Sequence, residues 1–152
     1  MKFFTRDWAD GDMTDAEADA VSPAYWHHLD ALDLPTPVRA LADLNTHDAN
    51  VLDVGYHAAA NTLRLRLRCG DQQTGYFDAM LTFAGATIRP ADAATLERAR
   101  RPANVEVLYD EVDRADGRTF EYRLLLYPAG EVSIRFTDVA IVRKPAVDRR
   151  AV

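Results

Sequence analysis

The sequence predicts an α+β fold, in which short N-terminal helices precede an antiparallel sheet of about six to seven strands with one inserted helix. The first observation is a change of period. Apolar residues recur at helical spacing before residue 46 and alternate with polar residues from residue 50 onward. The second is the segment 62–69, in which Leu63, Leu65 and Leu67 alternate with three arginines. A strand places these leucines on one face, whereas a helix would scatter the arginines around its circumference.

The length of 152 residues indicates one domain with a single core. We expect a helical part over residues 1–46, the sheet over residues 50–143, and a polar, frayed tail over residues 144–152.

The charge of the chain argues against two classes of partner. A formal net charge of −6 and a pI of about 5.1 oppose general binding to nucleic acid or to an anionic membrane, and they favour a basic protein partner. Arginine outnumbers lysine sixteen to two, a bias that we associate with a GC-rich bacterial genome. The single cysteine, Cys69, excludes an internal disulfide and suits a reducing compartment. Because neither a signal-peptide core nor a membrane span is recognisable, we expect a cytoplasmic protein.

Capping residues mark the predicted helices. Thr14 and Glu17 have the spacing of a capping box, and Ser22-Pro23 and Thr36-Pro37 each place proline at a first helical position. Three short helices are therefore predicted over residues 15–20, 23–32 and 36–44. The inserted helix is predicted over residues 90–101 and has arginines near its end, as the helix dipole prefers.

Six strands are predicted over residues 51–57, 62–69, 76–84, 104–112, 119–127 and 131–142. In the first hairpin, His57 opposes Thr62, so Asp53 opposes Arg66. The next pairing places Asp78 opposite Arg66 as well. Arg66 is therefore expected between two aspartates. Cys69 follows the parity of the leucines, which predicts a small core residue.

The last three predicted strands form a meander with one apolar face. Its register aligns, in order, Val105, Val107 and Tyr109 with Leu126, Leu124 and Tyr122, and these with Val132, Ile134 and Phe136. After Phe136 the apolar parity flips, which predicts a β-bulge or bend near Thr137 and Asp138. The tight turn before the last strand is expected at Pro128-Ala129-Gly130.

Two polar clusters follow from these registers. The arginines Arg64, Arg66 and Arg68 could grip an anionic ligand or acidic partner, but cross-strand pairing with aspartates is the favoured interpretation. The meander register sets Asp110 opposite Glu121, with Arg123 and Arg135 alongside. Opposed carboxylates suggest a metal or an acid pair, and neutralisation by the arginines is the favoured alternative.

A third cluster contains the candidate ligand or metal residues His47, Asp48, Glu111 and Asp138, which could meet at one end of the sheet. Their spacing matches no recognised metal pattern, and a carboxylate bonded to backbone is the commoner situation. The chain has no nucleophile elbow, phosphate loop, dinucleotide-binding turn or Cys-x-x-Cys pair. The sequence therefore assigns no catalytic residue and no cofactor.

Five short stretches also occur in a characteristic order: Met1 to Thr5, His47-Asp48-Ala49, Leu108 to Glu111, Phe120-Glu121-Tyr122 and Phe136-Thr137-Asp138. This order resembles the bacterial domain-of-unknown-function family 4085. The chain departs from that pattern at Phe3 and at Phe120-Glu121, where the family has tyrosine and tyrosine-glutamate. The resemblance implies helices followed by strands and implies no activity.

The sequence thus predicts a bacterial, non-enzymatic binding or accessory protein, such as an immunity-type inhibitor that covers a basic toxin. One alternative is a small metal-dependent hydrolase that uses His47, Asp48, Glu111 and Asp138. Another is a small-ligand-binding protein with its site between the sheet and the N-terminal helices. Oligomeric state stays open.

Overall fold

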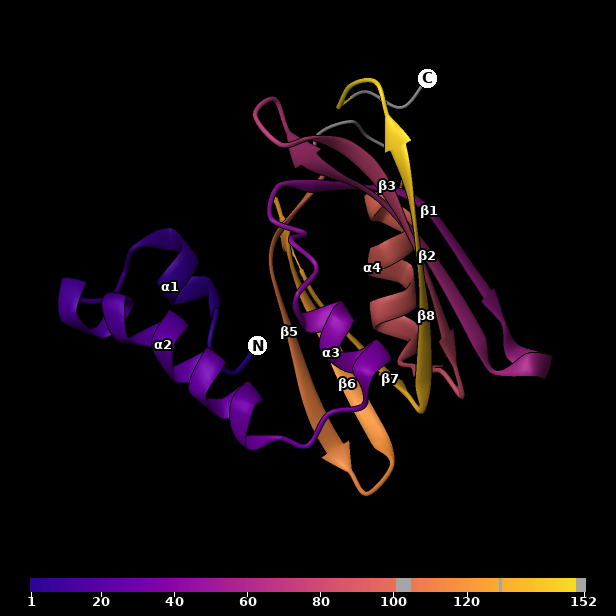
Figure 1. Ribbon diagram of the computed structural model, residues 1–152, viewed down its shortest axis with the longest axis horizontal. Helices are drawn as coiled ribbons and strands as arrows, with labels where there is room; N and C mark the ends of the chain where they lie inside the picture. Colours follow the sequence, from indigo (N-terminus) through magenta and orange to yellow (C-terminus); the bar gives the residue numbers. More distant parts are fainter. Residues whose placement is uncertain (101–104, 129, 150–152) are drawn as a thin grey trace.

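The computed structural model describes residues 1–100, 105–128 and 130–149, and these residues form an α+β fold with four α-helices and one eight-stranded antiparallel sheet (Figure 1). The helices are α1 (Arg6–Asp10), α2 (Asp15–Ala31), α3 (Thr36–Ala42) and α4 (Pro90–Ala99). The strands are β1 (Ala49–His57), β2 (Thr62–Asp71), β3 (Gly75–Ala84), β4 (Thr87–Ile88), β5 (Glu106–Asp116), β6 (Thr119–Tyr127), β7 (Glu131–Phe136) and β8 (Asp138–Ala146). The predicted fold class is confirmed, with slightly more strands than expected. None of the described helices is long and apolar enough to cross a membrane.

The N-terminal helices differ from the prediction in two ways. The capping box of Thr14 and Glu17 starts α2 as expected, but α2 continues through Pro23, so two predicted helices are one. Pro23 is exposed, and because it has no backbone N–H it removes one hydrogen bond from α2. The additional helix α1 begins at Thr5, whose hydroxyl accepts a hydrogen bond from the Trp8 backbone N–H at 3.3 Å, and ends at the left-handed Gly11.

The sheet rolls back on itself. Its strand order is β4-β7-β6-β5-β1-β2-β3-β8. Because β4 continues β3 after two residues and β8 continues β7 after one, the two ends of this order are joined along the chain. Figure 1 shows β5, β6 and β7 as one wall and β1, β2, β3 and β8 as the other. Helix α4 contacts β7 and β1, while α3 contacts β8 and β5, so helices bridge the two walls.

The corner between the walls lies at Gly85 and Thr137. Gly85 has a left-handed backbone with φ 59°, and a Cβ atom there would lie 2.5 Å from the Thr137 hydroxyl oxygen. The Thr137 backbone N–H and hydroxyl both donate to the carbonyl of Ala84, at 2.9 and 3.2 Å. The bend predicted near Thr137 and Asp138 is confirmed, and it carries the chain from one wall to the other.

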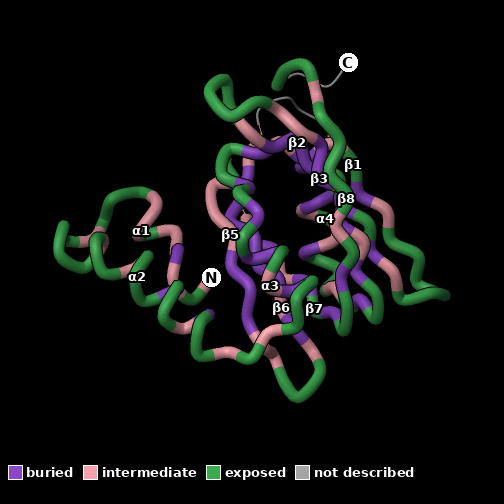
Figure 2. The backbone as a smooth tube through the Cα atoms, in the orientation of Figure 1, coloured by how far each residue is buried: buried purple, intermediate pink, exposed green. Residues whose placement is uncertain are grey.

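The core fills the space between the walls, where Figure 2 shows the buried backbone, while the N-terminal helices are largely exposed. Leu63, Leu65 and Leu67 are buried in β2, and Cys69 is fully buried beside them, as predicted. The strands of the predicted meander, β5, β6 and β7, also share one buried face, but their registers differ from the predicted ones. Tyr122 opposes Ile134 rather than Phe136.

The register of β5 against β6 is the prediction that was most wrong. The hairpin extends to Asp116, and β5 contains two irregularities, between Val107 and Tyr109 and between Arg114 and Asp116. Glu111 therefore opposes Arg123, and Asp110 opposes Leu124 instead of Glu121. This turns Asp110 away from the charged face of the hairpin.

Of the predictions for the first strands and the tail, some are confirmed and others are wrong. The β1–β2 register is confirmed, with Asp53 opposite Arg66, but Asp78 opposes Arg68. The tail was predicted to begin at residue 144, which is too early, because β8 stays paired with β3 through Ala146. Four predicted features lie outside the described residues: the last residue of the 90–101 helix, the first residue of the 104–112 strand, the central residue of the 128–130 turn, and residues 150–152 of the tail.

Candidate functional site

A cleft of about 310 Å³ lies between the N-terminal helices and the sheet, and we call it the aromatic cleft. Helices α1 and α2 form one side, and residues 42–47 with β5 form the other. Its walls are aromatic: Phe4, Trp8, Tyr25, Trp26 and Tyr109. A concave, largely apolar cavity of this size is typical of a binding site for a small molecule.

The aromatic walls hold one another in place. The ring centroid of Tyr109 lies 4.5 Å from Trp8 in an edge contact and 5.4 Å from Phe4 in a stacked one. Phe4 also packs edge-on against Tyr25 at 5.1 Å. The Trp8 indole N–H donates to the carbonyl of Ala18 at 3.1 Å, which fixes its ring against α2. These contacts preorganise the cleft.

Polar groups gather at the floor of the cleft around Asp110. The fully buried Thr46 hydroxyl donates to the Asp110 carboxyl at 2.6 Å. The Tyr122 hydroxyl lies behind them and is close enough to favour the charged carboxylate. It nevertheless meets no partner with hydrogen-bond geometry among the described residues. Asp110 faces the cleft with part of its surface, while protein surrounds most of the side chain, and this burial raises its pKa to about 7.

A bulge in β5 puts Tyr109 and Asp110 beside the same cleft. The irregularity after Val107 leaves Leu108 without a partner in β6, and the Leu108 carbonyl instead faces His47 Nδ1 at 2.6 Å. His47 therefore donates from Nδ1, and its ring stacks on Tyr109 with centroids 5.0 Å apart. The link between α3 and β1 is thus held against the bulge.

A buried ion cluster attaches the N-terminal segment to β5 and β6. Glu111 has no exposed surface and accepts the backbone N–H groups of Lys2, Phe3 and Phe4, at 2.9, 2.7 and 2.8 Å. It also accepts a hydrogen bond from Arg123 at 3.0 Å. The cluster therefore positions the segment that carries Phe4 and leads into α1.

Asp113 extends this cluster to α2. It accepts hydrogen bonds from Arg123 at 3.1 Å and from Lys2, and its carboxylate meets His28 Nε2 at 2.9 Å. Although burial opposes ionisation, these bonds hold the pKa of Asp113 well below its usual range. Asp113 is thus an ionised anchor for two parts of the N-terminal region.

The four predicted metal residues do not converge: only His47 and Asp48 lie close together, at 3.8 Å. His47 lines the aromatic cleft, and Asp48 is exposed next to it, with a left-handed backbone. Glu111 is saturated by its donors, and Asp138 is exposed at the bend, where its carboxylate accepts the Val139 N–H at 2.8 Å. The described residues contain no group of three or more His, Cys, Asp or Glu that could hold a metal ion.

The arginine face of β2 is largely neutralised by Asp78. Arg66 donates to the Asp78 carboxylate at 3.1 and 2.5 Å, and Arg68 donates to it at 2.5 Å, while Arg64 is exposed. Asp53 pairs instead with Arg100 at 3.4 Å. The interpretation of a paired surface is thus supported for Arg66 and Arg68.

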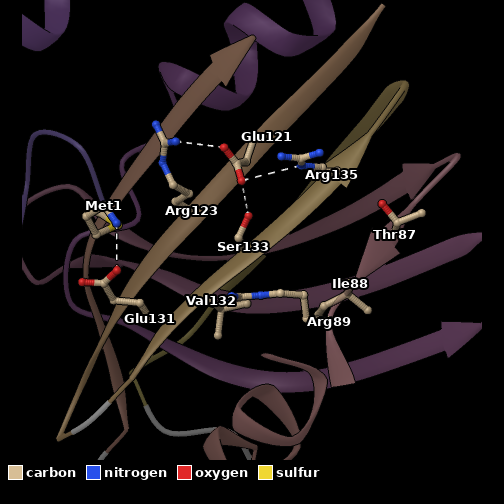
Figure 3. A pocket seen from close by; sticks show the side chains of 10 residues that line it. All are labelled: Met1, Thr87, Ile88, Arg89, Glu121, Arg123, Glu131, Val132, Ser133 and Arg135. Carbon is tan, nitrogen blue, oxygen red and sulfur yellow. Dashed lines mark hydrogen bonds and ion pairs between the residues drawn. The ribbon is translucent and has the colours of Figure 1, made fainter. Parts of the chain in front are cut away.

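A larger cavity of about 570 Å³ lies over β4, β6 and β7 (Figure 3). It contains most of the second predicted cluster, because Glu121 contacts Arg123 at 2.9 Å and Arg135 at 4.0 Å. Ser133 also donates to Glu121, at 2.5 Å. Since these groups largely satisfy one another, and Asp110 lies elsewhere, we do not regard this cavity as the primary site.

The sequence analysis offered a small-ligand site between the sheet and the N-terminal helices as an alternative, but apart from His47 and Asp110 it did not identify the residues of the aromatic cleft. Its polar centre was predicted on the wrong face, and its walls come from segments 80 or more residues apart, such as Trp26 and Tyr109. The available signal was the aromatic content of the first 26 residues, where both tryptophans of the chain occur. Comparison of the chain with protein-family models, with curated proteins and with solved structures gave no match.

Proposed function

We propose that the protein is a non-enzymatic binding protein that holds a small organic molecule in the aromatic cleft. The observation that carries this proposal is the convergence of rigid aromatic walls on a small polar floor in a cavity of about 310 Å³. This volume is at the lower end for ligand sites, so the ligand is expected to be smaller than a typical drug.

The polar groups of the cleft favour binding over catalysis. Thr46 is the hydroxyl nearest to a base, Asp110, but Thr46 is fully buried and cannot meet a substrate. The Nδ1 atom of His47 is engaged by the Leu108 carbonyl, and its Nε2 atom lies 3.8 Å from Asp48. Asp110 faces the cleft, but the hydroxyl that it holds belongs to the buried Thr46, which it cannot activate for attack on a substrate there.

Binding can be followed by intrinsic fluorescence, because Trp8 and Trp26 are the two tryptophans of the chain and both line the cleft. We expect at least one of three single-ring probes, 2-phenylethylammonium, 2-phenylethanol and 3-phenylpropionate, to change this emission saturably. Calorimetry should give the same affinity. Replacing the exposed Ser22, which lines the cleft, with phenylalanine should weaken binding by about tenfold or more through steric blocking.

The matched control is His27→Phe, an exposed position on the same helix that does not line the cleft. This variant should bind as the unchanged protein does. Absence of binding by all three probes, or equal binding by the Ser22 variant, would contradict the proposed function.

A second candidate function is the covering of a basic protein, as an immunity-type inhibitor does. Residues 1–33 carry eight acidic and two basic residues, and the remainder of the chain carries sixteen of each. The net charge of −6 therefore belongs to the segment that contains α1 and α2, which project from the sheet and are largely exposed (Figures 1 and 2). Such a surface would accelerate association with a cationic partner.

This candidate predicts salt-sensitive binding of a lysine-rich peptide. Changing Asp12, Asp15 and Asp19 to asparagine should weaken that binding about tenfold at low salt, measured by fluorescence anisotropy. The same number of charges removed from exposed positions outside the N-terminal segment, at Asp53, Glu97 and Asp116, should have a smaller effect. Equal losses in the two variants would count against a docking surface on α1 and α2.

A further inference from the structure

We infer that the aromatic cleft selects an organic cation, a protonated amine on an apolar or aromatic body, with the Asp110 carboxylate as its counter-charge. This inference rests on the proposed function and adds the chemical class of the ligand. It depends on the charges, the ring faces and the incomplete hydrogen bonding of the cleft, which are independent observations.

The charged side chains of the cleft are acidic. Among the described residues that line it, none is lysine or arginine, whereas Asp43 and Asp110 are both present. Asp43 is exposed and already pairs with Arg39 at 3.2 Å, which leaves Asp110 as the charge at the floor. An anionic ligand would meet this carboxylate without a compensating cation.

The walls also favour a cation. Five aromatic side chains surround the cleft, and the face of an aromatic ring carries partial negative charge that attracts ammonium groups within about 6 Å. The Arg39 guanidinium already lies 5.9 Å from the centroid of the Trp26 ring, so the attraction of a ligand cation rests mainly on Phe4, Trp8, Tyr25 and Tyr109. The acidic α1 and α2 form one side of the cleft, so the field of the N-terminal segment draws cations toward it. A neutral aromatic molecule would pack against the same rings, but neither the ring faces nor the acidic segment would attract it electrostatically.

The floor has unused capacity for hydrogen bonds. Asp110 receives the hydroxyl of Thr46, while the buried Tyr122 hydroxyl lies behind it and does not line the cleft. A carboxylate has two oxygens that together can accept several hydrogen bonds, so Asp110 can accept a further donor from the cleft that it lines. An ammonium group would donate to this carboxylate and keep it ionised.

Several titratable groups surround the Asp110 carboxyl: Tyr25 from α2, His47 from the α3–β1 link, Cys69 from β2, Glu111 within β5 and Tyr122 from β6. Burial raises the pKa of Cys69 to about 12 and raises those of both tyrosines, so these three groups stay protonated at neutral pH. Glu111 is held by its four donor groups. His47 requires its own control variant.

The test compares the three single-ring probes by calorimetry at pH 8. We expect 2-phenylethylammonium to bind about tenfold or more tightly than 2-phenylethanol, and 3-phenylpropionate to bind weakest. Asp110→Asn should reduce the preference for the ammonium over the alcohol to about unity, while Asp43→Asn should change it less than about threefold. Circular dichroism of each variant checks that it is folded.

The pH dependence supplies a second readout. Affinity for 2-phenylethylammonium should rise between pH 6 and pH 8 as Asp110 ionises, and this rise should persist in His47→Gln but vanish in Asp110→Asn. If the alcohol binds as tightly as the ammonium and Ser22→Phe blocks both, the proposed function stands and the cation inference is overturned. If no probe binds, both are overturned.

Discussion

Replacing Glu111 with alanine is expected to lower the free energy of unfolding by about 3–5 kcal/mol, because it leaves Arg123 buried without its innermost partner. The same change removes the acceptor of three backbone N–H groups in the N-terminal segment. Urea denaturation followed by circular dichroism measures the loss. Hydrogen exchange should additionally show faster exchange of the amides of residues 2–4.

Glu121→Ala is the matched control for this experiment. Glu121 lies on β6 together with Arg123 and also pairs with it, but the Glu121 side chain is 18% exposed. In this variant, water can replace part of the hydrogen bonding that Arg123 loses, so we expect the free energy of unfolding to fall by about 1 kcal/mol or less. Similar losses in the two variants would mean that burial of the ion cluster does not determine its contribution.

Raising the pH from 5 to 8 is expected to destabilise the protein through Asp110 by about 2–3 kcal/mol. Burial raises the pKa of this carboxyl from 3.8 to about 7, so the folded state holds one more proton than the unfolded state between these values. Stability is therefore highest below the unfolded pKa, falls as the pH rises, and levels off once Asp110 is ionised in both states. Asp110→Asn should remove this dependence, as urea denaturation at both pH values would show.

Asp43→Asn provides the control, because it removes an exposed aspartate from the same cleft. It should leave the decline from pH 5 to pH 8 unchanged. Asp113 acts in the opposite direction, since its lowered pKa contributes stability that is present above about pH 4 and is lost on acidification. A decline of equal size in Asp110→Asn would assign the effect to another group.

Local periodicity predicted the parts of the fold in which each strand is regular. The alternation in β2 placed Leu63, Leu65 and Leu67 in the core, and the short loop after His57 fixed the β1–β2 register. The parity change after Phe136 located a bend. These features depend on neighbouring residues, so a single sequence contains the information.

The candidate site depended on interactions that periodicity does not encode. The bulge at Leu108 changed the facing of Asp110, and no residue pattern in β5 distinguishes a bulge from a regular strand. Glu111 was predicted near a strand end, whereas its three backbone donors lie about 110 positions earlier in the chain. Helix α2 continues past Pro23, although the Ser22-Pro23 pair is a local signal for a helix start.

The attachment of the N-terminal segment to Glu111 has a consequence for sequence variation. Since the carboxylate is bound by main-chain amides, the Glu111 contact itself specifies no side chain at Lys2 or Phe3. These side chains are constrained separately, because the Lys2 ammonium group pairs with Asp113 and the Phe3 ring packs against Tyr25. Proline is the residue that would abolish a donor. Glu111 therefore requires backbone N–H groups in the segment, whereas the side chains of Lys2 and Phe3 answer to different partners.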